Sequence, residues 1–151
     1  MRIAGLLVLS GHLASLQQLD AVEYFAGVEN VVRAFTEIGL AAYGFELKKD
    51  TIAMDLLSAP GFLFAISLGL RTLRGGFSLF APVCSTWVWV SRHSTGRSYM
   101  NPMGNVHQAC TADANKMISR VVLMASLLIS RGCWVVIEQP VSSLMQYRVK
   151  L

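Results

Sequence analysis

The chain has 151 residues, of which 54% are hydrophobic and only 15% are charged, and its formal net charge is +4. A mean hydropathy of +0.49 excludes a disordered chain, and the length fits one domain with a buried core rather than a two-domain enzyme. Three widely spaced cysteines, Cys84, Cys110 and Cys133, fit neither a disulfide framework nor a zinc-binding spacing. They favour a reducing intracellular compartment, with an organellar or membrane-associated location as the alternative.

The charges are distributed unevenly. Residues 1–55 contain seven acidic and four basic side chains, whereas residues 56–151 contain nine basic side chains and only Asp113 and Glu138 as acids. A basic second half permits an anionic partner such as a nucleic acid. A solvated basic surface gives the same distribution, so both interpretations stay open.

Residues 1–19 are expected to form an apolar N-terminal helix or extension, ahead of an α/β domain at residues 20–151. The opening MRIAGLLVLSGHLAS also has the outline of a secretory signal, with an arginine, an apolar run and small residues. The apolar run is short and is broken by Gly5, which favours a helix that packs on the core.

The first half of the chain begins an alternation of strands and helices. An apolar run at residues 21–26 predicts a strand, and Asn30 suits the N-cap of an amphipathic helix that ends at Gly39. Residues 40–46 predict a second strand, and residues 51–55 predict a short third strand.

The second half continues the alternation. Ser58 and Pro60 begin a helix that runs to the glycine pair at positions 75 and 76. The remaining expected elements are a strand at residues 77–81, a polar loop at 91–108, a helix at 113–130 with apolar residues at helical spacing, and a strand at 133–137.

This alternation predicts a Rossmann-like α/β fold with a doubly wound, mostly parallel sheet. Apolar strands covered on both faces account for the high hydropathy without a bilayer. The uncharged runs at residues 56–70 and 75–91 are shorter than the about 20 residues that a membrane span needs. Arginines flank them, so interfacial membrane contact stays open.

In an open parallel sheet, ligands bind beyond the carboxyl ends of the strands. The first strand leads into Phe25 and Gly27, and the second and third end in the acids Glu46 and Asp55. The last two strands lead into Cys84 and Glu138, whose side chains we expect to face one cleft. Because Glu138 follows an apolar run, its carboxylate is expected near a cleft or in a pair.

This order of residues resembles the S-adenosylmethionine-dependent methyltransferases, and most of all the DNA cytosine-5 methyltransferase family. The strand and turn EYFAGVEN, residues 23–30, resembles the family's D-x-F-x-G-x-G-G motif. Pro82-Val83-Cys84 is similar to its P-P-C motif, and Glu138-Gln139-Pro140 is similar to its E-N-V motif. The resemblance covers roughly residues 20–141 and implies a methyltransferase-type fold with an incomplete C-terminal half.

The resemblance also implies roles for individual residues. S-adenosylmethionine would be held by Phe25, Gly27, Glu46 and Asp55, with Glu46 on the ribose and Asp55 near the adenine amine. Cys84 as a thiolate would add to C6 of cytosine, and Glu138 would contact the ring near N3. Arg92 and Arg97 would lie near the phosphates of a duplex from which the base is flipped. The residues alone leave simpler alternatives: Cys84 as a small buried side chain and Glu46 as a surface acid beside two lysines.

The chain departs from the family at several positions. Glu29 and Asn30 replace glycines where the methionine carboxylate passes, and Val83 replaces the proline beside the nucleophile. We therefore expect a methyltransferase-like protein that is impaired or inactive alone and that needs a partner protein or a missing C-terminal half. The alternative is a non-catalytic structural or interaction subunit of a larger complex, which a membrane association would also suit. No metal is expected, because the histidines share no ligand spacing.

Overall fold

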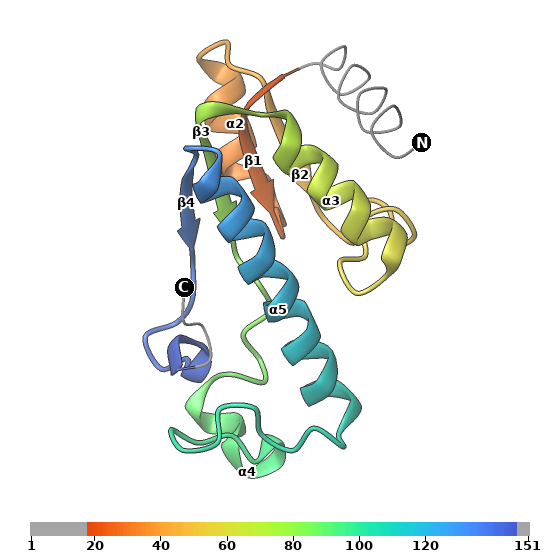
Figure 1. Cartoon of the computed structure of the whole chain (residues 1–151), viewed down its shortest axis with the longest axis vertical. Coiled ribbons are helices and arrows are strands. Elements are labelled where there is room, and N and C mark those ends of the chain that lie inside the picture. The colour runs from red at the N-terminus through yellow and green to blue at the C-terminus, as the bar shows by residue number, and fades with distance from the viewer. Residues whose placement is uncertain (1–17, 148–151) are drawn as a thin grey trace, which may run out of the picture.

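The computed structural model describes residues 18–147, and these form a sheet of four parallel strands (Figure 1). The strand order is β2-β1-β3-β4. The strands are β1 (Leu19–Tyr24), β2 (Ala42–Phe45), β3 (Thr72–Phe80) and β4 (Trp134–Ile137). The predicted α/β class with a parallel sheet is therefore confirmed, and the fold is compatible with a Rossmann-like arrangement.

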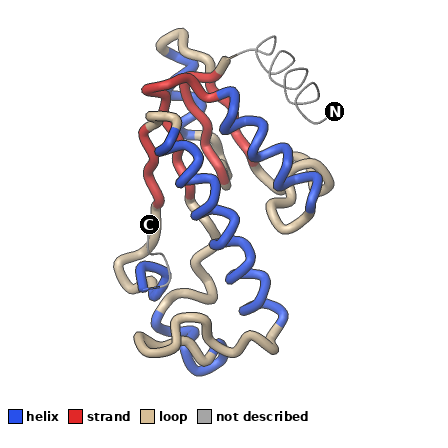
Figure 2. The backbone as a smooth tube through the Cα atoms, viewed as in Figure 1, coloured by secondary structure: helices blue, strands red, loops and turns tan. Residues whose placement is uncertain are grey.

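Helices lie on both faces of the sheet (Figure 2). Helices α3 (Ala59–Arg71) and α5 (Ala109–Ser130) pack together on one face, where the Tyr24 hydroxyl donates to the carbonyl of Ala65. Helix α2 (Asn30–Glu37) lies on the other face, where the Phe35 ring stacks on Phe77 with centroids 5.7 Å apart. The remaining short elements are η1 (Trp89–Ser91), α4 (Arg92–Thr95) and η2 (Leu144–Tyr147).

The main core lies between the sheet and the pair α3 and α5. Tyr24 at the centre of this core is fully buried and stacks on Phe80 at 4.4 Å. Burial raises the pKa of the Tyr24 hydroxyl far above its ordinary value. A second, smaller core of Trp87, Ile118 and Met145 packs the segments that follow β3 and β4 against the first half of α5.

The predicted third strand at residues 51–55 is wrong. Asp50 Oδ1 accepts hydrogen bonds from the backbone N–H groups of Ile52 and Ala53, at 2.9 and 2.8 Å. The N–H of Met54 also donates to the carbonyl of Asp50. These local bonds hold the segment in consecutive turns, because an aspartate that bonds nearby backbone competes with strand pairing.

The expected boundary between α3 and the next strand is also displaced. Helix α3 begins as predicted, with Ser58 Oγ accepting from the N–H of Gly61, but it ends at Arg71 and passes directly into β3. The glycine pair lies inside β3, at a shift in its pairing with β1. Gly75 has a φ of +80°, and a Cβ on Gly76 would lie 2.8 Å from the Leu73 carbonyl oxygen. The pair therefore forms an irregularity that only glycine fits.

The structure gives other predicted segments different first and last residues. The polar segment 91–108 contains α4, and α5 begins at Ala109, four residues before the predicted start. The predicted N-terminal helix or extension lies outside the described residues, apart from Gln18, which has no regular secondary structure, and Leu19, which belongs to β1.

Within residues 18–147 there is no helix whose length and apolar character would let it cross a lipid bilayer.

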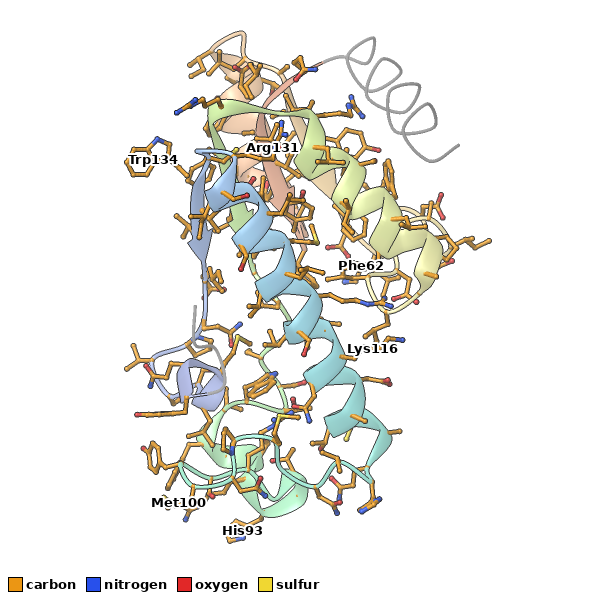
Figure 3. All side chains as sticks on the ribbon, in the orientation of Figure 1. Phe62, His93, Met100, Lys116, Arg131 and Trp134 are labelled. Atoms are coloured by element: carbon orange, nitrogen blue, oxygen red, sulfur yellow. The ribbon has the colours of Figure 1, made fainter. Side chains whose placement is uncertain are left out.

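The outer part of one sheet face is uncovered. Val135 and Ile137 of β4 pack toward the main core, so the alternate residues Trp134 and Val136 point to the face that carries α2. Helix α2 lies mainly over β1 and β2, and its Phe35 ring reaches Phe77 of β3 but not β4. Trp134 is 73% exposed and projects from the edge strand into solvent (Figure 3).

Candidate functional site

A cavity of about 320 Å³ lies at the carboxyl edge of the sheet, beyond β1 and β2. Its wall includes Phe25, Glu46 and Asp55, three of the four side chains predicted to hold a cofactor. The other lining residues are mostly apolar, apart from Lys48: Phe45, Leu47, Met54, Leu56, Ala81, Val83 and Met117. Strand ends that are distant in sequence meet here because parallel strands end at the same edge.

The turn between β1 and α2 has an unusual backbone. Phe25, Gly27 and Glu29 all adopt left-handed conformations, with φ values of 63°, 53° and 58°. Two of these residues carry side chains, for which this conformation is strained. Hydrogen bonds from the N–H groups of Phe25 and Ala26 to the Phe45 carbonyl, at 2.8 and 3.2 Å, hold the turn against β2.

Glu46 joins this turn to the end of β2. Its Oε2 accepts a hydrogen bond from the N–H of Gly27 at 2.9 Å, and its Oε1 accepts one from the N–H of Lys48 at 3.1 Å. A carboxylate has about four acceptor positions, so both oxygens keep capacity for a ligand's hydroxyl groups. Gly27 and Glu46, which the sequence placed in one site, are therefore in direct contact.

Asp55 reaches the cavity from a loop rather than from the expected strand. The N–H of Leu57 donates to its Oδ1 at 2.8 Å, and its carbonyl lies so close to Gly61 that a Cβ there would be 2.0 Å away. The loop is also fixed from α5. Arg120 donates to the carbonyls of Leu56 and Ser58, at 2.6 and 2.7 Å.

Lys116, one turn before Arg120 on α5, completes this attachment. Its Nζ donates to the carbonyl of Leu57 at 2.8 Å, and the Arg120 guanidinium lies over the Phe62 ring of α3 at 4.5 Å. Figure 3 labels Lys116 and Phe62. Sequence reasoning missed both Lys116 and Arg120. Their spacing of four along α5, whose only other charged residue is Asp113, was the available signal, because it places two cations on one side of the helix.

The N-terminus of α2 is capped from within the fold by Glu23. This carboxylate is only 7% exposed, and its Oε2 accepts from the N–H groups of Val31 and Val32, both at 3.0 Å. The predicted cap, Asn30, is instead the first residue of the helix and its Oδ1 accepts from Arg33. Glu23 lies on the face of β1 that α2 covers, which brings its side chain under the first turn of the helix.

Glu29 occupies the N-cap position, but its side chain makes no hydrogen bond to the helix. Its carboxylate forms an ion pair with Lys49 and lies across Gly44, where a Cβ would be 2.0 Å from Oε1. Gly44 thus provides the space that the Glu29 side chain uses. A second negative charge therefore lies beside the turn that forms one wall of the cavity.

Cys84 and Glu138, the predicted catalytic pair, do not line this cavity. Cys84 is half-buried at the start of a turn, where its carbonyl accepts from the N–H groups of Trp87 and Val88. Glu138 is exposed, and its side chain has no hydrogen bond or ion pair within the described chain. Among residues 18–147 the expected partner of Glu138 is not found, because its side chain points outward, to the same side as Trp134 and Val136.

The neighbouring side chain, Gln139, connects the ends of β3 and β4. Its Nε2 donates to the carbonyl of Pro82 at 2.7 Å, and its Oε1 accepts from the Ser143 hydroxyl at 3.0 Å. Gln139 is therefore the polar group that turns inward at this strand end.

Arg97 is buried rather than near an external phosphate, contrary to the expectation. It is 2% exposed, its guanidinium lies 3.5 Å from the centre of the Trp87 ring, and it donates to Asn115 Oδ1 at 2.9 Å. Arg92 is half-buried and stacks on Trp89 at 3.9 Å, with part of its side chain open to solvent. Of the two arginines, only Arg92 remains available to a nucleic acid.

In the part of the chain that the structure describes, no three side chains of the metal-ligating types come together. Comparison of the chain with protein-family models, with curated proteins and with solved structures finds no significant match.

Proposed function

We propose that this chain is a methyltransferase-like domain, related to the S-adenosylmethionine-dependent DNA cytosine-5 methyltransferases, that binds the adenosine part of the cofactor and is inactive in methyl transfer alone. The observation that carries the proposal is the cavity that Phe25, Glu46 and Asp55 share. An aromatic ring, apolar walls and two carboxylates suit a base, a ribose and an exocyclic amine.

The adenosine half of the cofactor fits these residues, and the methionine half does not. Glu46 accepts from Gly27 and still has acceptor positions for ribose hydroxyls, and Asp55 has one oxygen engaged by Leu57. Glu29 stands at a position where the family's motif has a glycine, and its carboxylate, which lies against Gly44 beside the turn, would disfavour a methionine carboxylate there. The cofactor would supply an electrophilic methyl group, and residues of this chain would only orient its nucleoside.

The positions of Cys84 and Glu138 support an inactive state for the isolated chain. Neither side chain lines the cavity, and Glu138 projects into solvent. Methyl transfer to cytosine in this family's manner requires a nucleophile beside the cofactor's methyl group. Activity would therefore require a partner protein or a further segment that repositions these strand ends, and Arg92 would be the contact to a nucleic acid.

A non-catalytic structural or interaction subunit is the second candidate function. It is favoured by the uncovered outer part of the sheet, where the edge strand exposes Trp134 and Val136. Exposed apolar side chains on an edge strand are typical of a surface that another protein covers. A membrane-associated complex is one setting for such a subunit.

Calorimetric titration with adenosine and S-adenosylhomocysteine tests the first function. We expect one site per chain for adenosine, and a loss of about tenfold or more in affinity for Glu46→Gln, since a hydrogen bond to a charged acceptor contributes about 1.5–3 kcal/mol. Glu37→Gln, on the exposed end of α2, is the matched control. A folded protein that binds no adenine nucleoside would rule out this function and leave the interaction subunit.

A further inference from the structure

We propose that the cavity selects adenine nucleosides whose 5′ group is uncharged, and that it rejects those with a carboxylate or phosphate in that position. This inference rests on the proposed nucleoside site and specifies its ligand class. It follows from three features of the described residues that disfavour an anionic group beside the cavity.

The first feature is the internal cap on α2. The N-terminus of a helix that follows the first strand is the usual receptor for a ligand's anionic group, because its free N–H groups and its dipole attract negative charge. Here the N–H groups of Val31 and Val32 both donate to Glu23, at 3.0 Å. Since Glu23 is buried beneath the helix, these two N–H groups are not free to donate to a ligand's carboxylate or phosphate.

The second feature is the Glu29–Lys49 pair. The turn that leads to α2 carries the Glu29 carboxylate, and Gly44 gives it the space to lie against β2. Lys49 is bound in this ion pair, and Arg33 of α2 donates to the Val28 carbonyl and to Asn30 Oδ1. A ligand's anion that approached α2 would meet the Glu29 charge and would compete for Lys49.

The third feature is the charge of the cavity wall. Glu46 and Asp55 are its two acids and Lys48 is its one base, so acceptors outnumber cations. The hydroxyl and amino groups of a nucleoside are donors that such a wall can bind, whereas a phosphate would add repulsion. A volume of about 320 Å³ is at the lower end for ligand pockets, which suits a nucleoside without a large 5′ extension.

A panel of four ligands tests this selectivity on the full chain: adenosine, 5′-methylthioadenosine, adenosine 5′-monophosphate and S-adenosylhomocysteine. Calorimetry should give similar dissociation constants for the first two. The two ligands with an anionic 5′ group should bind about tenfold or more weakly. Equal or tighter binding of S-adenosylhomocysteine would overturn the inference while leaving the nucleoside site intact. Failure of all four ligands would overturn the proposed function itself.

The Glu29→Gly variant tests the cause. Glycine adopts the φ of 58° at this position without strain, so the variant should fold. We expect its affinity for S-adenosylhomocysteine to rise by about fivefold or more and its affinity for adenosine to stay within about twofold of the parent chain. Glu37→Gln should change neither. If Glu29→Gly binds adenosine normally and gains no affinity for S-adenosylhomocysteine, the role assigned to Glu29 is refuted.

Discussion

Replacement of Glu23 should expose how much the first turn of α2 depends on one buried carboxylate. Glu23 Oε2 accepts two backbone N–H groups at 3.0 Å and lies at the positive end of the helix dipole. Hydrogen bonds to a charged acceptor contribute about 1.5–3 kcal/mol each, and water can partly replace them at the half-buried Val31 and Val32. We therefore expect Glu23→Ala to lower the free energy of unfolding by about 2–4 kcal/mol.

Glu23→Gln separates charge from hydrogen bonding. The amide oxygen can take the place of Oε2 and keep both bonds, but charge-assisted bonds are roughly twice as strong as neutral ones. We expect a loss of about 1–2 kcal/mol, which lies between the parent chain and Glu23→Ala. Urea unfolding followed by far-ultraviolet circular dichroism measures both losses.

Glu37→Gln is the control, because Glu37 is exposed at the other end of α2 and its replacement should change stability by no more than about 0.5 kcal/mol. Sulfate gives a second measurement. It should stabilise Glu23→Gln more than the parent chain, since the variant leaves the helix N-terminus without its carboxylate. If Glu23→Ala unfolds within 0.5 kcal/mol (about the control's limit) of the parent chain, the cap contributes little and the argument for an occupied helix N-terminus fails.

The remaining predictions concern packing and thiol chemistry. Arg97→Lys should lower the free energy of unfolding by about 2–4 kcal/mol, because one lysine side chain cannot both stack on Trp87 and bond Asn115. The same change at Arg92 should cost under about 1 kcal/mol. Urea unfolding that ranked the two variants in the opposite order would contradict the buried role of Arg97. Gly61→Ala should lower the free energy of unfolding by about 1–3 kcal/mol, since its Cβ would lie 2.0 Å from the Asp55 carbonyl oxygen. Gly69→Ala on the same helix should raise the free energy of unfolding by up to about 1 kcal/mol. Equal effects of the two variants on the thermal midpoint would refute this packing. A disulfide reagent should modify the exposed Cys110 first and Cys133 only on unfolding, because burial raises the pKa of the Cys133 thiol. Mass spectrometry that found Cys133 labelled first in the native chain would contradict this order.

Much of the fold could be predicted because its elements carry strong local signals. The apolar repeat of α5 and the hydroxyl of Ser58 at the start of α3 act within a few residues, so the sequence is sufficient to locate them. The prediction of a strand at residues 51–55 was wrong because the apolar content of the segment favoured a strand, whereas the side chain of Asp50 accepts hydrogen bonds from the backbone of Ile52 and Ala53 and holds the segment in turns.

The site was predicted in part for a similar reason. Phe25 and Glu46 meet because both follow parallel strands, which the alternation of elements implied. Asp55 reaches the same cavity without a strand, because Arg120, 65 positions away in the chain, holds its loop in place.

Contacts between distant residues account for the errors at Arg97 and Glu138. Nothing near Arg97 in the sequence indicates that Trp87 and Asn115 surround it. The apolar run before Glu138 hides the fact that β4 is covered on one face only, which decides the direction in which Glu138 points.

The position of β1 in the sheet has a consequence for how the chain folds during synthesis. Among the described strands β1 is made first, and it pairs with β3, whose first residue, Thr72, lies 48 positions after Tyr24. At about 5–20 residues per second, the ribosome takes roughly 2 to 10 s to add that stretch. During this delay the backbone N–H and C=O groups on the edge of β1 that will pair with β3 have no partner, so the nascent chain is exposed to chaperones and to aggregation before its sheet can close.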